Sequence, residues 1–219
     1  MTDPFANRRP RPAATGRPVL DAVLTDLATA DTELEERVVR REEIYRGRYM
    51  VLEKDEVVRP DGSASSRDIV LHPGAVVIAP LDADGRLFLV VQYRLAGNGA
   101  MLELPAGTLD VHDGVVEDPE TAAHRELEEE TGYRAGSMER IGGYYSAPGF
   151  LTEYLSLFLA TDLQPAVRDR LSPDDDERIR LVRLHWREAI AAINTGLIED
   201  SKSIAGILLL ARRLEARGR

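Results

Sequence analysis

The chain concentrates negative charge in one short segment. The 21 residues from Asp110 to Glu130 hold nine acidic side chains and one basic side chain, Arg125, which gives this segment a net charge of −8. Like charges this close together repel, so the fold must either spread them into solvent or bring positive charge to them. A solvated helix face is the usual meaning of such a run, and a divalent-cation site is the alternative.

The second half of this segment is predicted to be a helix. Asp118 and Pro119 form a strong start signal, because Asp is a favoured N-cap and Pro is well tolerated in the first turn. Gly132 is a natural stop, since many helices end on a residue in the left-handed conformation that glycine adopts readily. The spacing therefore predicts a helix that ends at about Thr131.

Three glutamates of this helix share one face. Glu126, Glu129 and Glu130 are separated by three and four positions, which places them on the same side. Their repulsion is costly unless a hard cation neutralises it, and a set of oxygen ligands suits Mg²⁺ or Mn²⁺ better than a soft metal. Arg125 can brace one of the carboxylates with a bidentate contact. On spacing alone, a polar surface helix remains the alternative.

Strand patterns surround the helix. Residues 32–71 alternate in polarity and predict an antiparallel meander, and residues 75–79 and 87–93 predict a hairpin that turns at 82–85. Further strands are expected near 102–107, 138–144, 154–160 and 179–186, and helices near 19–28, 187–195 and 201–217. Mixed strands with one helix in mid-chain indicate an α/β sandwich.

Composition limits the classes of function. The 219 residues contain no cysteine, which excludes disulfides, Cys-based zinc sites and thiol catalysis. The longest apolar runs, 75–81 and 204–211, are too short to span a bilayer, and we see no apolar stretch typical of a secretory signal near the start. The net charge of −10 argues against a general nucleic-acid binder. We therefore expect a cytoplasmic protein with neither a membrane nor a nucleic acid as partner.

The acidic helix resembles the box of the Nudix hydrolases. In that pattern a glycine, a spacer, a glutamate and seven further residues precede Arg-Glu-aliphatic-x-Glu-Glu-x-Gly-aliphatic. Residues 125–132 meet every fixed position, with Tyr133 in the last apolar place, and Glu117 stands where the earlier glutamate is required. Glu117 is expected to brace the start of the helix, or to stabilise its N-terminus through the helix dipole.

One departure from the family pattern lies before the helix. Gly107 matches the opening glycine, but nine residues separate it from Glu117, whereas the usual pattern has a spacer of five. The resemblance therefore implies a longer loop over residues 109–116, with the register of the helix unchanged.

Further segments resemble the ADP-ribose pyrophosphatase branch of this family. Pro148, fifteen residues after Tyr133, stands where that branch carries its marker proline. The other segments are 92–94, 103–107, 147–150 with Glu153, and 203–206. The resemblance implies a Nudix α/β/α sandwich with a mixed sheet over residues 73–219. A small N-terminal antiparallel sheet over 21–72 and a disordered Arg- and Pro-rich arm over 1–20 are expected before it.

The resemblance also implies a metal site. Glu126, Glu130 and the backbone carbonyl of Ala106 would ligate Mg²⁺, with Mn²⁺ as a possible substitute. Glu129 would be a further ligand or a close support, and Arg125 would orient the glutamates.

The general base and the substrate contacts are expected outside the helix. In the family the base is often an acid on a loop, which points to Glu177 first and to Asp175 and Glu153 after it, with a solvated acidic loop as the alternative. Arg94 and Arg67 resemble the arginines that hold phosphate and ribose, although Arg67 could equally be an exposed strand residue. The full set of expected substrate contacts is Arg67, Arg94, Glu103, Tyr49 and Pro148.

The function implied is hydrolysis of the pyrophosphate of ADP-ribose to AMP and ribose 5-phosphate by metal-activated water. The box does not encode the base or the sugar, so another nucleoside diphosphate sugar such as GDP-mannose is the alternative. A non-catalytic ADP-ribose sensor is a third hypothesis. Such regulators usually append a basic winged-helix domain, whereas only about 30 residues follow Trp186 here. In this branch the N-terminal sheet commonly swaps across a homodimer, so we expect a homodimer.

Overall fold

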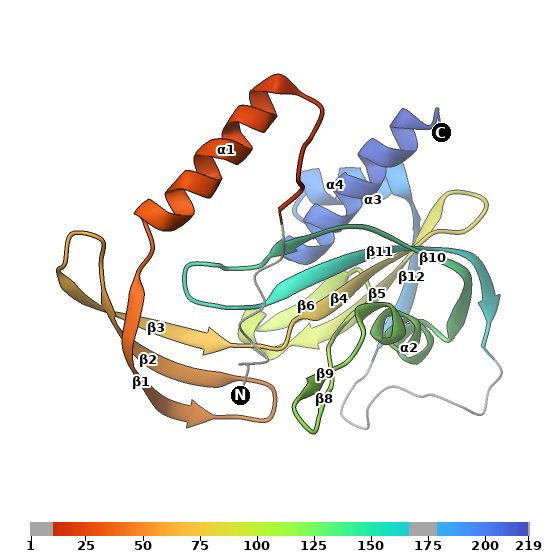
Figure 1. Cartoon of the computed structure of the whole chain (residues 1–219). Helices are drawn as coiled ribbons and strands as arrows, with labels where there is room; N and C mark the ends of the chain where they lie inside the picture. The colour runs from red at the N-terminus through yellow and green to blue at the C-terminus, as the bar shows by residue number, and fades with distance from the viewer. Residues whose placement is uncertain (1–10, 167–178, 219) are drawn as a thin grey trace. The chain divides into compact units, whose positions relative to one another are not determined.

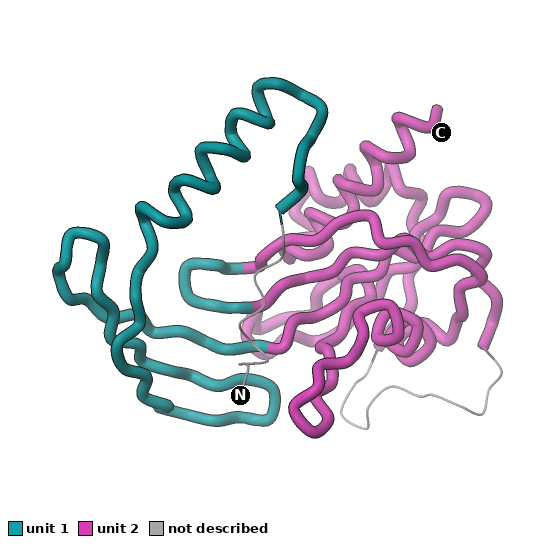
Figure 2. Tube along the Cα trace, in the orientation of Figure 1, with its two compact units in different colours: residues 1–72, 147–152 teal, residues 73–146, 153–219 magenta. Residues whose placement is uncertain are grey.

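The computed structural model describes residues 11–166 and 179–218 (Figure 1). The chain divides into two units (Figure 2). The first unit consists of the residues up to 72 together with 147–152, and the second consists of the remainder.

The first unit contains one helix and an antiparallel meander of three strands, in the order β1-β2-β3. Val51 and Val57 of β2 are buried, whereas every residue of β1 is exposed. The segment 147–152 joins this unit, because the Val70 N–H donates to the Phe150 carbonyl at 2.7 Å. The expected N-terminal antiparallel sheet is confirmed. The elements are α1 (Pro18–Glu33), β1 (Arg37–Arg46), β2 (Val51–Val58) and β3 (Ala64–Leu71).

Helix α1 is longer than the sequence pattern predicts. The expected helix covered residues 19–28, but α1 begins at Pro18 and continues to Glu33. The arm expected to be disordered over 1–20 therefore overlaps the start of this helix by three residues. None of the helices in the described part of the chain is long and apolar enough to cross a membrane.

The second unit has a mixed sheet in the order β10-β11-β4-β7, a three-stranded sheet β12-β5-β6 and a small hairpin β8-β9. Strand β4 runs parallel to β11 and antiparallel to β7. The strands are β4 (Ala75–Pro80), β5 (Arg86–Arg94), β6 (Gly99–Glu103), β7 (Ala106–Thr108), β8 (Val111–His112), β9 (Val115–Val116), β10 (Tyr133–Tyr145), β11 (Tyr154–Pro165) and β12 (Arg180–His185). A 3₁₀ turn, Leu95–Gly97, precedes β6.

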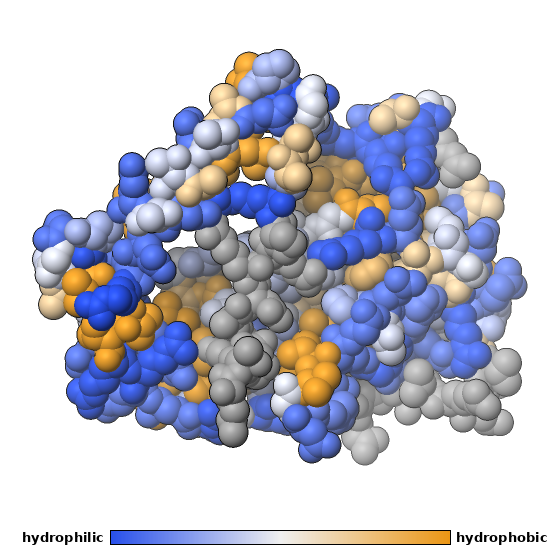
Figure 3. Space-filling view, viewed as in Figure 1, coloured by the Kyte–Doolittle hydropathy of each residue, from blue (hydrophilic) through white to orange (hydrophobic). Residues whose placement is uncertain are grey.

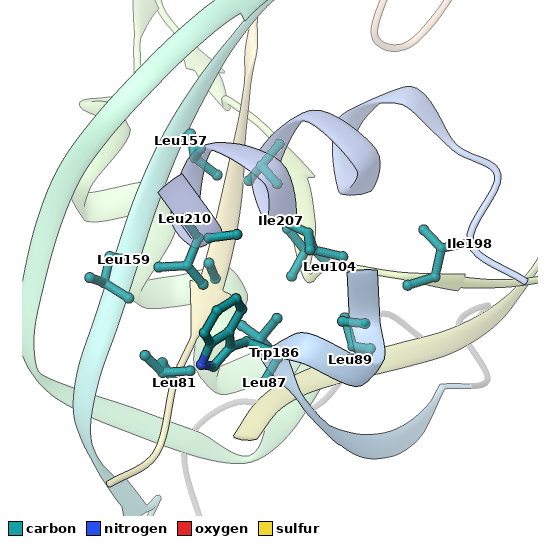
Figure 4. Close-up of a cluster of buried hydrophobic side chains, with 14 of the residues drawn as sticks. Leu81, Leu87, Leu89, Leu104, Leu157, Leu159, Trp186, Ile198, Ile207 and Leu210 are labelled. Carbon is teal, nitrogen blue, oxygen red and sulfur yellow. The ribbon is translucent and has the colours of Figure 1, made fainter. Parts of the chain in front are cut away.

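Two apolar cores lie on opposite faces of the mixed sheet. All six residues of β4 are buried, as expected for a strand covered on both sides. Val76 and Ile78 pack with α2 (Pro119–Thr131), whereas Val77 and Ala79 join the core formed with α3 (Trp186–Asn194) and α4 (Ser201–Ala216). Figure 4 shows the core formed with α3 and α4, where side chains from these two helices and from the strands point toward one another. The predicted α/β/α sandwich is confirmed.

Three details differ from the expected elements. Only Leu81 and Leu87 pair across the turn at 82–85, because β4 and β5 diverge into different sheets. The extended stretch 102–107 is two strands, since Leu104 and Pro105 lie between β6 and β7. The late strand ends at His185, so Trp186 starts helix α3 instead of closing the strand.

The lengthened loop before α2 is a small hairpin. Asp113 and Gly114 both have positive φ, 53° and 78°, and they connect β8 to β9. Two residues with positive φ at a two-residue connection are typical of a type I′ turn. The additional residues therefore form a local hairpin and leave the register of α2 unchanged. Figure 3 shows a hydrophobic patch over this hairpin, where Val111 and Val115 are exposed.

Candidate active site

The ends of α2 follow from local sequence. The side chain of Asp118 accepts hydrogen bonds from the N–H groups of Glu120 and Thr121, at 3.1 and 3.0 Å, so Asp118 is the N-cap. Gly132 closes the helix in the left-handed conformation, with φ of 71°. The predicted helix is therefore confirmed in its bounds. Leu127 is fully buried against the sheet, which turns the glutamate face away from the core.

Arg125 is the centre of a cluster of carboxylates. Its Nη1 donates to Glu126 Oε1 at 2.7 Å and to Glu129 Oε2 at 3.0 Å, and its Nη2 donates to Glu117 Oε2 at 2.9 Å. Burial alone would lower the pKa of Arg125, but the hydrogen bonds and charges of these carboxylates outweigh burial and raise it. One guanidinium thus donates hydrogen bonds to three carboxylates, and the cluster keeps an excess of negative charge.

Glu117 fastens the hairpin to this cluster. Besides its contacts with Arg125, its Oε2 accepts from the Asp110 N–H at 3.2 Å, and its own N–H donates to the Asp110 carbonyl at 2.8 Å. Burial would raise the pKa of Glu117, but the hydrogen bonds from Arg125 and Asp110 hold it below its ordinary value. The cap of the helix is Asp118, so Glu117 acts on the loop and on Arg125.

The backbone of strand β7 lies in direct contact with two glutamates of α2, Glu126 and Glu130. The Ala106 N–H donates to Glu130 Oε2 at 3.0 Å, and the side chain of Glu130 is largely buried. At the next residue, a methyl group built on Gly107 would overlap the carboxylate of Glu126. Glycine is therefore required here by close approach, and its φ is unexceptional. The fold thus brings Ala106, Glu126 and Glu130 together.

The residues fit a hard divalent cation in donor type and charge. The side chains of Glu126, Glu129 and Glu130 on this face of α2 all offer carboxylate oxygens as metal ligands. The single positive charge of Arg125 does not neutralise the carboxylates that it contacts. Among the described residues, no three carboxylate or imidazole groups converge in metal-ligating positions. Glu126 and Glu129 point instead to Arg125, and Glu130 to Ala106. The ligand set Ala106, Glu126, Glu129 and Glu130 therefore stays a prediction.

A second charged cluster surrounds Glu103, whose side chain is 1% exposed. Arg94 donates to it through Nη2 at 2.7 Å and Nε at 3.0 Å, and Lys202 Nζ donates at 2.6 Å. Asp200 accepts from the same Nζ at 2.8 Å. Burial alone would raise the pKa of Glu103, but the hydrogen bonds of Arg94 and the charge of Lys202 hold it below its ordinary value.

Sequence patterns pointed to Arg94 and Glu103 but missed Lys202 and Asp200. Asp200 stands directly before the helical pattern and is a favoured N-cap residue, and it does cap α4. Nothing local indicates that Lys202 reaches a carboxylate 99 residues earlier in the chain.

The other expected site residues lie elsewhere. Arg67, Tyr49 and Pro148 belong to the first unit, where Arg67 is engaged by Glu36 through Nε at 2.9 Å. Glu153 is half-buried in the second unit. Both Asp175 and Glu177 lie outside the described residues. Their roles in catalysis or substrate binding stay predictions.

Comparisons with known proteins agree with this arrangement. The family model of the NUDIX domain matches residues 70–205, and the nucleoside diphosphate sugar hydrolase N-terminal domain matches residues 36–70. An ADP-ribose pyrophosphatase of Bacillus subtilis is 34% identical over 186 residues, which cover 84% of this chain and 98% of the relative.

A GDP-mannose pyrophosphatase and a solved structure extend the comparison. The former, from Pectobacterium atrosepticum, is 36% identical over 138 residues, covering 60% of this chain and 68% of the relative. The crystal structure of an ADP compounds hydrolase matches with a TM-score of 0.74 at 22% identity, covering 84% of this chain and 97% of that one. At this identity the structural likeness shows the shared fold.

Proposed function

The chain belongs to the Nudix hydrolases, and from this premise we propose that it cleaves the pyrophosphate of ADP-ribose into AMP and ribose 5-phosphate with Mg²⁺ as cofactor. It is an enzyme of nucleoside diphosphate sugars or related compounds. The observation that carries the proposal is the charge imbalance around Arg125, where one guanidinium contacts three carboxylates. Such a cluster accepts an additional cation at little cost, and a cation can then receive an anionic substrate.

Residues of this chain have distinct tasks in the proposal. Glu126, Glu129, Glu130 and the carbonyl of Ala106 would hold the ion, and Arg125 would keep the glutamates in place. When bound, the divalent ion neutralises phosphate charge and lowers the pKa of water. Mg²⁺ is preferred on donor type, and Mn²⁺ is expected to replace it, because both favour oxygen ligands.

Arg94 is proposed to bind a phosphate oxygen. Its guanidinium is anchored on the buried carboxylate of Glu103, which fixes a planar fork of donors in one orientation. Preorganised positive charge of this kind contributes to catalysis because it needs no rearrangement during the reaction. The proton of the attacking water is assigned first to Glu177, with Asp175 and Glu153 as the other candidates. Tyr49, Arg67 and Pro148 are proposed to line the substrate.

A substrate panel tests the proposal. Purified protein is incubated with Mg²⁺ and with ADP-ribose, GDP-mannose and other nucleoside diphosphate sugars, and the release of AMP or GMP is measured. We expect ADP-ribose to have the highest kcat/KM and chelation of the metal to stop the reaction. Absence of hydrolysis of every compound in the panel would refute the enzymatic proposal.

GDP-mannose is the second candidate substrate. The similarity to a GDP-mannose pyrophosphatase supports it, although that similarity covers less of the chain than the similarity to the ADP-ribose pyrophosphatase. A higher kcat/KM for GDP-mannose than for ADP-ribose would select this alternative and leave the metal site unaffected.

We also propose that the protein is a homodimer through its first unit. Strand β1 exposes all ten of its residues, including Val38, Val39, Ile44 and Tyr45, and such apolar exposure is typical of an interface. Light scattering after gel filtration is expected to give twice the mass of the chain. A cytoplasmic location belongs to the same proposal, because nucleoside diphosphate sugars are made and used there, and cell fractionation tests it.

A further inference from the structure

The first turns of α4 contact the strand end formed by Glu103, the last residue of β6, and Leu104, which follows it. This strand end leads into the acidic face, by which we mean Glu126, Glu129 and Glu130 of α2. Lys202 Nζ donates to Glu103 at 2.6 Å, and the Ser203 hydroxyl accepts from the Leu104 N–H at 2.7 Å. One turn later, a methyl group built on Gly206 would meet Leu104 Cδ1 at only 2.6 Å, so the helix lies very close to the strand end. Lys202, Ser203 and Gly206 of α4 therefore contact the two neighbouring residues Glu103 and Leu104.

These contacts are withdrawn from water. Glu103, Leu104 and Ser203 are almost completely buried. Lys202 is held in turn by Asp200, which also accepts from the Ser203 N–H at 3.0 Å as the cap of the helix. A buried carboxylate or N–H that loses its partner cannot turn to solvent, so the loss is costly. The start of α4 thus fixes the strand end firmly.

The fixed strand end continues directly into the acidic face. The Pro105 carbonyl accepts from the Ile78 N–H at 2.8 Å, and the Ala106 N–H donates to Glu130 at 3.0 Å. Only Pro105, whose φ is restricted by its ring, separates Leu104 from Ala106. A displacement of Leu104 would therefore also displace the backbone of Ala106.

We propose that Lys202 and Ser203 are positioning residues that set the divalent-cation affinity of the acidic face. They hold Glu103 and Leu104, and through them keep the backbone of Ala106 in place against Glu130. The inference rests on the proposed function, in which Ala106 and the glutamates of α2 bind the ion. Neither residue is among the proposed ion ligands or substrate contacts, so each would act as an outer partner of the site. Loss of such partners typically lowers metal affinity about 10- to 100-fold.

The test measures Mn²⁺ binding to the full chain by titration calorimetry without substrate, together with Mg²⁺-dependent hydrolysis and thermal unfolding. For Lys202→Met and Ser203→Ala we expect Mn²⁺ affinity to fall about 10-fold or more. We expect kcat at saturating metal to fall much less. Lys202→Arg, which retains the charge, is expected to restore most of the affinity. Arg212→Met, at an exposed position of the same helix, is the matched control and should change neither quantity.

Each outcome decides the inference. A lower unfolding temperature with unchanged Mn²⁺ affinity would show that these contacts only stabilise the fold, and would overturn it. If Lys202→Met does not fold, Ser203→Ala decides by the same two measurements, since it keeps every charge. A wild type that binds Mn²⁺ but hydrolyses no nucleoside diphosphate sugar would refute the proposed function, while the affinities of the variants still decide this inference. A wild type that does not bind Mn²⁺ would overturn both.

Discussion

Two charged clusters in the second unit have opposite charge balances. Around Arg125, one guanidinium contacts three carboxylates, so negative charge is in excess. Around Glu103, the two cations Arg94 and Lys202 meet the two carboxylates Glu103 and Asp200, so charge is balanced. Both clusters are rich in acids, yet only the first calls for an additional cation. The balance of charge, more than the number of acids, separates a candidate metal site from an ion pair that positions the backbone.

Glu130 shares the helix face of Glu126 and Glu129 in the unbalanced cluster, and removing its charge should have the largest effect. In Glu130→Gln the side chain keeps its size and an oxygen that can accept from the Ala106 N–H, but it loses its charge. We expect kcat for ADP-ribose to fall by at least about 100-fold, because an ion ligand is weakened. The unfolding temperature should stay within about 2 °C of the wild type.

Glu120→Gln is the matched control for that substitution. Glu120 is exposed in the first turn of the same helix, so it changes the same charge away from the cluster. Its kcat should equal that of the wild type. Full activity of Glu130→Gln would contradict the assignment of Glu130 as an ion ligand.

Crowding the unbalanced cluster should have the next largest effect. In Gly107→Ala the new methyl group would overlap the carboxylate of Glu126, so either the carboxylate or strand β7 must move. We expect Mg²⁺ to activate the enzyme with about 10-fold lower affinity, and stability to fall by about 1–3 kcal/mol. In the control Gly99→Ala, the nearest atom to the new methyl group lies at 3.9 Å. If both variants behave alike, the close approach at Gly107 has no role.

The balanced cluster should respond in stability. Glu103→Gln leaves Arg94 and Lys202 without their buried carboxylate, and breaking such a pair costs about 3 kcal/mol. Urea unfolding of this variant and the wild type measures the difference. We expect kcat/KM to fall as well, because Arg94 loses its anchor. A variant as stable as the wild type would show that the cluster is not balanced in the way described.

The same carboxylate predicts a pH dependence. The pKa of Glu103 is lower in the folded chain than its ordinary value of 4.5, so the unfolded chain binds the proton more readily. The stability contributed by Glu103 is therefore present in full above about 4.5 and is lost as pH falls through the folded pKa. The difference in unfolding free energy between wild type and Glu103→Gln should shrink over that range. A difference that stays constant down to pH 3 would contradict the lowered pKa.

The unbalanced cluster could be largely predicted because its signals are local. The cap at Asp118, the stop at Gly132 and the spacing of Glu126, Glu129 and Glu130 all lie within fifteen residues. Helical geometry alone places these carboxylates on one face. The sequence also indicated that Arg125 would brace these carboxylates. It did not indicate that Glu130 would accept from the Ala106 N–H, because that contact depends on the path of β7.

The balanced cluster could be predicted only in part. Arg94 and Glu103 stand nine residues apart on neighbouring strands, whereas Lys202 arrives from 99 residues away on a helix packed across the core. Pairing at that distance depends on tertiary packing, for which no short pattern exists. The divergence of β4 from β5 escaped prediction for the same reason, since their partners β11 and β12 come late in the chain.

The hairpin before α2 gives the smallest expected effect and separates two kinds of glycine. Its Asp113-Gly114 turn was a recognisable hairpin signal between apolar residues, although a loop was predicted there. Gly114 has φ of 78° and open space around its Cα, so Gly114→Ala strains the backbone without a clash. We expect a cost of about 1 kcal/mol. Activity should stay within about 2-fold of the wild type, because Glu117 and Asp110 still anchor the base of the hairpin to Arg125.

Chemical denaturation and a kcat/KM measurement of Gly114→Ala check both values, with Gly107→Ala measured in parallel for comparison. A large loss of activity in Gly114→Ala would mean that the hairpin belongs to the site, and that the unbalanced cluster extends beyond α2 and β7.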